Sequence, residues 1–194
     1  MARILKIMTY TDEIINNPVK LSHYIIKNRL ENNIKACDMT AGNGKDSKFI
    51  LEMKNPEILY AFDIQKLSQK RCEELIGKRD NFKFILDDHK NIEKYIKEKI
   101  DFFIYNLGFL PKGDKSITTN YKTVIKSLEA SLNLLNKNGL ILITFYTGHS
   151  QGKSEAEFVG KFLKNLDQKA YQIIKYDFFN QINNPPFLIS IRKV

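Results

Sequence analysis

Apolar and polar positions alternate along the chain in a pattern that predicts alternating strands and helices. Short apolar runs are typical of buried parallel strands, and the longer segments between them have apolar residues at helical spacing. This alternation indicates an α/β fold with a parallel sheet and helices on both of its faces. The predicted strands cover residues 34–38, 58–64, 82–86, 101–106 and 140–146. The predicted helices cover residues 12–31, 45–54, 66–77, 90–99, 120–136 and 153–167.

Glycine and asparagine mark one helix end in this pattern. Asn138 and Gly139 follow the helix predicted over 120–136, and residues of these types often end a helix in the left-handed conformation. We therefore expect them to close that helix before the fifth strand begins.

The end of the chain departs from the alternation. Residues 171–181 and 187–194 both have the composition of strands, and only residues 182–186 separate them. A parallel crossover needs a dozen or more residues, so these two strands must form an antiparallel hairpin. Five strand–helix units followed by a β-hairpin are the layout of class I methyltransferases, whereas a plain dinucleotide-binding fold has a parallel sixth strand. We predict a Rossmann-like fold with a seven-stranded, mostly parallel sheet.

Length and composition are compatible with a single domain over residues 1–194, of which 43% are apolar. No apolar run approaches the ~20 residues of a membrane span. The N-terminus lacks the continuous apolar segment of a signal peptide, so we expect a cytoplasmic protein with no membrane partner. Cys37 and Cys72 form no CxxC pair, and too few Cys and His residues are clustered for a zinc site. No metal is therefore predicted.

The charge of the chain is strongly positive. Lys and Arg outnumber Asp and Glu by 31 to 22, which gives a formal net charge of +9. Such an excess favours a polyanionic partner such as nucleic acid. A Lys-rich composition inherited from an AT-biased genome would give the same count, so charge alone does not decide between the two.

The first predicted strand leads into a turn with the chemistry of a cofactor site. The turn begins at Asp38, and its Gly42 and Gly44 permit close approach of the backbone to a ligand. The dinucleotide-binding fingerprint needs a third glycine at position 47, where this chain has Ser47. An acidic residue before the glycines suits S-adenosylmethionine (SAM), which carries an amino group and no pyrophosphate, better than it suits NAD.

The second and third predicted strands end in carboxylates. Asp63 is placed to accept both ribose hydroxyls, with help from Gln65. Asp63 could instead cap the helix that follows, and the two roles can coexist. Asp87 lies where this fold usually binds the adenine amino group; Asp88 competes for that role, and one of the two could be only a cap. The predicted cofactor site comprises Asp38, Thr40, Gly42, Asn43, Gly44, Asp63, Gln65 and Asp87.

The fourth and fifth strands end in candidates for the acceptor site, because ligands of open α/β sheets bind beyond the carboxyl ends of the strands. Asn106 could orient an amine through its carboxamide, and Phe109 could stack on a base, unless the segment is an ordinary connecting loop. His149 could accept a proton or be a solvated loop residue. Tyr146 could stack on a base or belong to the core.

Basic residues near the same edge are expected to contact phosphates; they are Lys112, Lys115 and Lys153. The string Asn-Pro-Pro-Phe at 184–187 matches the acceptor motif of adenine amino-methyltransferases, but there it follows the fourth strand. We interpret the proline pair mainly as a rigid turn, with a place beside the active site as the other possibility.

Several strings together resemble one known family over nearly the whole chain. They are VKLSHYIIK (19–27), DMTAGNGKDS (38–47), AFDIQ (61–65), LDDH (86–89), YNLGFLPKGDKSITT (105–119), YTGHSQGKSE (146–155) and NQINNPPFLISI (180–191). The chain is similar to the family described as "putative rRNA methylases", which includes the bacterial transfer RNA 5-aminomethyl-2-thiouridine methyltransferase. Relatives commonly have His at the position of Lys45 and Thr at that of Ser47, which are mild departures.

The resemblance implies a SAM-dependent enzyme that acts on the anticodon arm of tRNA. The implied reaction methylates the exocyclic amine of 5-aminomethyl-2-thiouridine at the wobble position, giving 5-methylaminomethyl-2-thiouridine. Asn106, Asp114 and His149 match the family strings near the acceptor and are the implied catalytic candidates.

Other functions stay open at this stage. An rRNA methyltransferase or a small-molecule amine N-methyltransferase would have the same fold, and no obvious RNA-binding domain is appended. A non-catalytic SAM- or RNA-binding module is disfavoured by the intact acceptor-loop string, and an NAD-dependent oxidoreductase by Ser47 and the terminal hairpin. A homodimer would cover a tRNA arm more easily than one small domain, but no segment indicates one.

Overall fold

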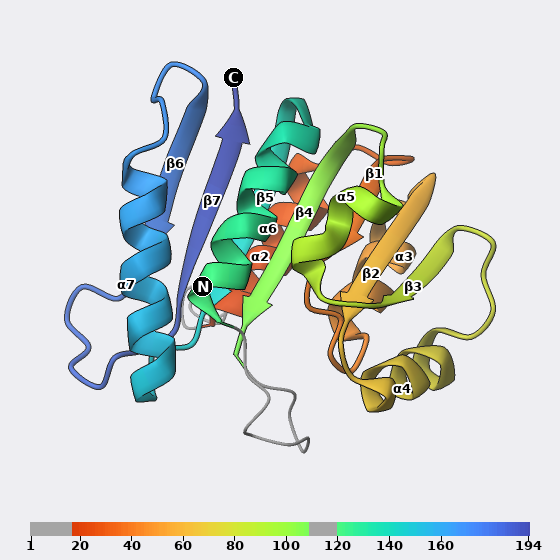
Figure 1. Ribbon diagram of the computed structural model, residues 1–194, viewed down its shortest axis with the longest axis horizontal. Helices are drawn as coiled ribbons and strands as arrows, with labels where there is room; N and C mark the ends of the chain where they lie inside the picture. The colour runs from red at the N-terminus through yellow and green to blue at the C-terminus, as the bar shows by residue number, and fades with distance from the viewer. Residues whose placement is uncertain (1–16, 109–119) are drawn as a thin grey trace, which may run out of the picture.

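A seven-stranded sheet runs through the molecule (Figure 1). The computed structural model describes residues 17–108 and 120–194. Within them the spatial order of the strands is β3-β2-β1-β4-β5-β7-β6. The strands are β1 (Lys35–Asp38), β2 (Ile58–Asp63), β3 (Phe82–Leu86), β4 (Ile100–Leu107), β5 (Leu135–Phe145), β6 (Tyr171–Tyr176) and β7 (Phe187–Lys193).

The strand order reverses at the centre of the sheet. β1 pairs in parallel with β2 on one side and with β4 on the other, so that Asp38 lies opposite both Ala61 and Ile104. β7 runs antiparallel to β5 and to β6, which confirms the predicted terminal hairpin. In open sheets of this type the ligand crevice lies beyond the carboxyl ends of the strands at the point of reversal.

Helices cover both faces of the sheet, as predicted (Figure 1). The side chains of β4 alternate between two cores: Phe102 and Ile104 pack on one side, Phe103 and Tyr105 on the other. This burial on both faces explains why β4 is a nearly continuous apolar run. One face carries α2 (Pro18–Arg29), α3 (Lys45–Lys54) and α4 (Lys66–Ile76). The other carries the 3-10 turn η1 (His89–Asn91), α5 (Ile92–Tyr95), α6 (Tyr121–Leu134) and α7 (Ser150–Lys164).

The expected closure of a helix by Asn138 and Gly139 is wrong. α6 ends at Leu134, and β5 begins at once with the buried Leu135, which pairs with Ile100 of β4. Asn138, whose φ is 65°, lies within β5, where the pairing with β4 shifts register. Burial of Leu135 against the neighbouring strand therefore prevails over the local turn preference of Asn138.

Other predicted elements differ in extent, including the helix predicted over 153–167, which is α7 at Ser150–Lys164. The helix predicted over 90–99 is reduced to η1 and α5, because among its residues only Ile92 and Ile96 are buried apolar side chains. The strand predicted over 171–181 ends at Tyr176. The first helix begins at Pro18, capped by the Asn17 side chain, and the part of the predicted helix before residue 17 lies outside the described residues.

Gly44 permits close packing of α3 on α4. Its φ is 77°, and a Cβ atom there would lie 2.9 Å from the Cys72 Sγ and 3.2 Å from the Cys72 Cα. We expect Gly44→Ala to lower the free energy of unfolding by about 2 kcal/mol or more, from left-handed strain plus overlap. In α7, a Cβ at Gly160 meets nothing within 4 Å. Gly160→Ala should instead stabilise the protein by up to ~1 kcal/mol. Urea denaturation of both variants measures the contrast, and equal effects would contradict it.

Candidate active site

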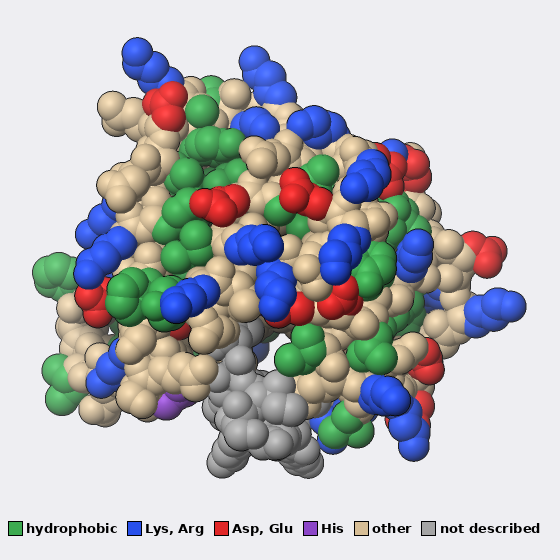
Figure 2. Space-filling model, in the orientation of Figure 1, with side chains coloured by type: hydrophobic (Ala, Val, Ile, Leu, Met, Phe, Trp, Pro, Cys, Tyr) green, Lys and Arg blue, Asp and Glu red, His purple; other side chains and the backbone are tan. Residues whose placement is uncertain are grey.

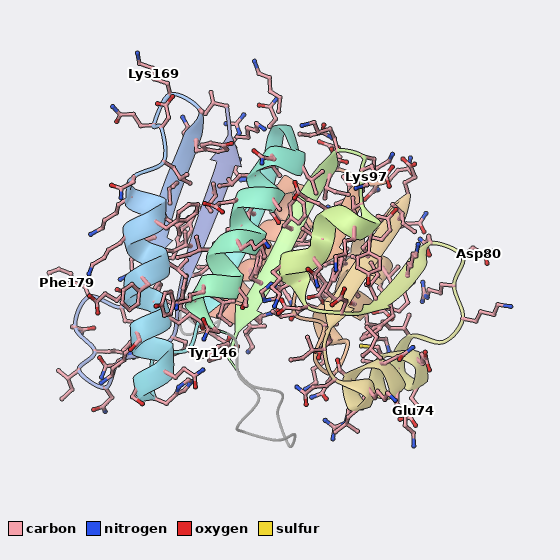
Figure 3. The ribbon with its side chains drawn as sticks, viewed as in Figure 1. Glu74, Asp80, Lys97, Tyr146, Lys169 and Phe179 are labelled. Carbon is pink, nitrogen blue, oxygen red and sulfur yellow. The ribbon has the colours of Figure 1, made fainter. Side chains whose placement is uncertain are left out.

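Two neighbouring hollows open at the carboxyl ends of the central strands. The larger has a volume of about 540 Å³ and the smaller about 170 Å³, and Thr40 and Asp63 line both. Figure 3 shows Tyr146, which follows β5, at the same edge of the sheet where β4 ends. The described residues that line the larger hollow are Asn17, Val19, His23, Thr40, Ala41, Gly42, Asn43, Lys45, Asp46, Asp63, Asn106, Gly108 and Tyr146.

The buried carboxylate of Asp38 holds the turn that follows β1. Its Oδ1 accepts a hydrogen bond from the Thr40 backbone N–H at 3.1 Å, and its Oδ2 accepts one from the Ser47 hydroxyl at 2.7 Å. Ser47, which replaces the third glycine of the dinucleotide fingerprint, is thus a hydrogen-bond donor to this carboxylate. Asp38 lines neither hollow and lies beneath the turn. Burial, reinforced by the nearby charge of Asp46, raises the pKa of Asp38 to about 7.

The raised pKa of Asp38 predicts a pH dependence of stability. Its ordinary value of 3.8 applies to the unfolded chain, so between pH 4 and 7 the folded state binds more protons. This contribution to the free energy of unfolding is therefore lost as pH rises through that window. Asp38→Asn removes the titration, and its amide can still accept from Thr40 and donate to Ser47. We expect the variant to gain on the order of 3 kcal/mol relative to wild type between pH 4 and 8. Urea titrations at both pH values measure it; a constant difference would show that Asp38 is already ionised at pH 4.

Asp63 joins the end of β2 to the glycine turn. Its Oδ2 accepts from the Gly42 backbone N–H and its Oδ1 from the Gln65 backbone N–H, both at 2.9 Å. Each oxygen keeps a further lone pair for a ligand. Gln65, rather than Asp63, is the N-cap residue of α4 and lines neither hollow. Asn43 lines the larger hollow, with its Oδ1 accepting from Arg71.

The two carboxylates after β3 have different partners in the smaller hollow. Asp87 accepts hydrogen bonds from the Tyr95 hydroxyl at 2.8 Å and from the Asn91 amide at 2.9 Å, and the first of these chiefly holds its pKa below the ordinary value. Asp88 caps η1 through the Lys90 backbone N–H. The sequence did not decide which of the two carboxylates is a helix cap, and the structure gives this role to Asp88. Asp87 stays the candidate for the adenine contact.

Asn106, near the end of β4, is held by two hydrogen bonds. Its backbone N–H donates to the Thr40 Oγ1 at 2.7 Å, and its side-chain Nδ2 donates to the Asp46 Oδ2 at 2.6 Å. Its side-chain Oδ1 is buried and has no hydrogen-bond partner among the described residues. A buried acceptor without a donor is unfavourable by about 1–3 kcal/mol, so this oxygen is a candidate for contact with a ligand.

Sequence reasoning missed several residues that line the larger hollow, and two of them, Asp46 and His23, contact each other there. Asp46 lies in the first turn of α3, where an acidic residue is ordinarily explained by the helix dipole. His23 lies on α2 and contacts the Asp46 Oδ1 through its Nε2 at 2.6 Å. His23 belongs to the string VKLSHYIIK and Asp46 to the string DMTAGNGKDS. The sequence does not show that these two segments meet, whereas the fold does.

The remaining predicted residues have varied positions. Tyr146 is 38% exposed and lines the larger hollow, and burial of its hydroxyl raises its pKa. His149 is the N-cap residue of α7, its Nδ1 accepting from the Gly152 backbone N–H at 3.0 Å, and it lines neither hollow. Lys153 is exposed in the first turn of α7. Phe109, Lys112, Asp114 and Lys115 lie outside the described residues.

The proline pair of the hairpin lies beside this edge of the sheet. The Thr147 hydroxyl contacts the carbonyl oxygens of Asn184 at 2.9 Å and Pro185 at 3.1 Å. Thr147 directly follows Tyr146, so the Asn-Pro-Pro-Phe segment is tied to the loop that borders the larger hollow. This contact agrees with a place beside the site, whereas residues 184–186 have no hydrogen-bonded turn and lead directly into β7.

The charges around the hollows suit a cationic ligand. Asp46 and Asp63 line the larger hollow with Lys45, and Asp87 lines the smaller one. Carboxylates at the glycine turn repel a pyrophosphate, whereas they attract an amino group or a sulfonium. Among the described residues, no group of His, Cys, Asp and Glu could hold a metal ion. In the same part of the chain, no helix is long and apolar enough to cross a bilayer.

The sheet order, the acidic glycine turn and the two hollows define a class I, SAM-dependent methyltransferase. A profile of the family described as "Putative rRNA methylase" matches residues 59–192, and the chain belongs to this family.

Solved structures agree with this assignment. A "putative rRNA-methylase" from Clostridium thermocellum is 35% identical, with 92% of this chain and 98% of that chain covered and a TM-score of 0.88. A "putative methyltransferase" from Streptococcus mutans, solved in complex with SAH, is also 35% identical with the same coverage, and its TM-score is 0.82. Among curated proteins, the chloroplastic "tRNA (mnm(5)s(2)U34)-methyltransferase" of Arabidopsis thaliana is 26% identical over 188 residues, which cover 90% of this chain and 69% of that protein.

Proposed function

We propose that this enzyme methylates the exocyclic amine of 5-aminomethyl-2-thiouridine at the wobble position of tRNA. One observation carries the amine as acceptor: the buried Asn106 Oδ1 has no donor among the described residues, and it belongs to a side chain that lines the larger hollow. A primary amine supplies the missing N–H donor. The tRNA substrate is supported by the name of the Arabidopsis relative.

The residues around the hollows fit SAM. Asp63 would accept the ribose hydroxyls with its remaining lone pairs, and Asp87 would accept from the adenine amino group. Gly42, with a φ of 53°, allows the turn to approach the ligand closely. Asp38 would act beneath the turn, by holding Thr40 and Ser47. When bound, SAM supplies an electrophilic methyl group on a sulfonium.

The chain's own residues would then prepare the acceptor nitrogen. A primary alkylamine has a pKa of roughly 10, by analogy with Lys, and arrives as an ammonium. The carboxylates of Asp46 and Asp63 attract that cation into the hollow. One proton must pass from the ammonium to solvent water before the lone pair can attack, and a desolvated site next to a second positive charge lowers the pKa of the amine. Asn106 Oδ1 would accept from a remaining N–H and so aim the lone pair.

Surface charge is consistent with an RNA partner without marking a single patch. The chain has a net charge of +9. Figure 2 shows Lys and Arg side chains spread over the face that α5, α6 and α7 cover, with Asp and Glu side chains among them. We place the contacts to the tRNA backbone at the edge of the sheet where the hollows open. Lys153, which is exposed in the first turn of α7, is a candidate for one of them.

Salt dependence distinguishes an RNA acceptor from a small amine. Neutralising several phosphates releases counterions, so tRNA affinity should fall steeply between 50 mM and 200 mM salt, by about tenfold for every two phosphates contacted. Fluorescence anisotropy with labelled tRNA measures this, and Lys153→Gln should reduce the slope. A flat response, together with methyl transfer to free alkylamines, would favour the small-molecule alternative. Transfer to ribosomal RNA alone would favour the reaction in the family description.

A further inference from the structure

We infer that Asp46 is a positioning residue, which fixes the orientation of the Asn106 carboxamide so that its oxygen faces the acceptor amine. The inference rests on the proposed amine acceptor and extends it by a residue outside the glycine turn and the strand ends. The amide nitrogen of Asn106 lies 2.6 Å from the Asp46 Oδ2, and both side chains line the larger hollow.

A carboxylate decides the orientation of a neighbouring carboxamide. Ionised Asp46 can only accept hydrogen bonds, so the donor end of the Asn106 amide must face it. The backbone N–H of Asn106 is anchored to the Thr40 Oγ1, which fixes the position from which the side chain extends. Because the backbone N–H and the side-chain Nδ2 of Asn106 are both held, only the Oδ1 is left to accept a hydrogen bond. This oxygen has no partner among the described residues.

Asp46 is itself held from the opposite side. Its Oδ1 lies 2.6 Å from the His23 Nε2, which must carry a proton in this contact. The His23 ring stacks on Phe49, one turn further along α3, with a centroid separation of 3.9 Å and an interplanar angle of 6°. The His23 side chain is 26% exposed and that of Asp46 17%, so solvent competes little for either contact. One continuous chain of contacts thus runs from Phe49 through His23 and Asp46 to Asn106. It ends at the Asn106 Oδ1, which would face the methyl-accepting amine.

The orientation has a consequence for substrate choice. An oxygen acceptor without its own hydrogen selects an attacking group that carries N–H or O–H, and it rejects a carbon or a tertiary nitrogen. If the carboxamide were turned, its Nδ2 would face the acceptor and compete for the lone pair that has to attack. Asp46 therefore favours the orientation in which the Asn106 Oδ1 accepts from an N–H of the amine and the lone pair stays free to attack. It disfavours the orientation in which the Asn106 Nδ2 donates to that lone pair.

The test compares Asp46→Asn with wild type in methyl transfer to tRNA. An amide at position 46 can present either a donor or an acceptor, so it no longer fixes Asn106. We expect kcat to fall by about 10- to 100-fold, as for loss of orientation alone, while SAM affinity changes by less than about threefold. KM for tRNA should rise only by the share of the ammonium attraction that Asp46 contributes beside Asp63. Adding Asn106→Asp to Asp46→Asn restores a carboxylate–amide pair with an oxygen toward the acceptor, and should recover kcat at least about fivefold.

Two further variants separate positioning from a general effect. Glu52→Gln removes a carboxylate from an exposed site of the same helix and should leave kcat unchanged. His23→Phe keeps a ring beside Phe49 but loses the donor to Asp46, so it should lower kcat with SAM affinity retained.

A spectroscopic readout tests the contact without turnover. The side-chain amide protons of Asn106 should exchange slowly with solvent in nitrogen-15 spectra of wild type, and fast in Asp46→Asn. Unchanged exchange, or an unchanged kcat in Asp46→Asn, would overturn the inference while the proposed reaction stands. If the amide protons respond as expected but wild type transfers no methyl to tRNA, the positioning contact is supported and the proposed reaction is refuted.

Discussion

Replacing Asn106 by alanine is expected to lower kcat by roughly 10²- to 10³-fold, the range found when one pre-positioned hydrogen-bonding group is removed from an active site. The side chain contributes a buried oxygen with no partner of its own among the described residues, at the end of the strand next to the reversal point. SAM affinity should stay within about twofold of wild type, since the candidates for the cofactor lie on β1, β2 and β3 and the turns after them.

The matched control for Asn106 is Asn133→Ala. Asn133 lies on α6 and is exposed, so the same chemical change there should leave both kcat and SAM affinity unaltered. Steady-state kinetics with labelled SAM, alongside calorimetry of SAM binding, separates the two effects. If Asn106→Ala turned over normally with SAM bound, the orienting role would be wrong.

Replacing Asp63 by alanine is expected to weaken SAM binding by about 30-fold or more, which corresponds to roughly 2 kcal/mol. Two effects add: the ribose loses its acceptors, and the Gly42 backbone N–H loses the carboxylate that holds the turn. Because Asp63 would contact the ribose and not the methyl group, SAM and S-adenosylhomocysteine should lose affinity to the same extent.

Asp80→Ala is the control for Asp63. Asp80 is exposed before β3, on the far side of the molecule from Tyr146 in Figure 3. Calorimetry with both ligands measures the change. An affinity loss confined to SAM would contradict a ribose contact and place Asp63 near the sulfonium instead.

Much of the fold was predictable because burial leaves a strong pattern in the sequence. β4 is buried on both faces and therefore reads as a continuous apolar run, and the short connection before β7 permits only an antiparallel pairing. Predictions failed where long-range pairing opposed a local signal. Asn138 has the conformation of a helix terminator but lies inside β5, since Leu135 is buried against β4.

The candidate site was predictable where it follows a strand end. Asp63, Asp87 and Asn106 were expected from their place after an apolar run, and all three line a hollow. Asp46 and His23 were missed because each looks ordinary on its own helix, and their meeting depends on how α2 packs on α3. His149, by contrast, was expected near the methyl acceptor but lines neither hollow and caps α7.

The most direct test of the proposed reaction is methyl transfer from labelled SAM to bulk tRNA that lacks the wobble methyl group, with mass spectrometry of the product nucleosides. The proposal predicts a gain of one methyl group on 5-aminomethyl-2-thiouridine, abolished by Asn106→Ala and retained by Asn133→Ala. Label on a different nucleoside, or no label from an enzyme that binds SAM, would contradict it.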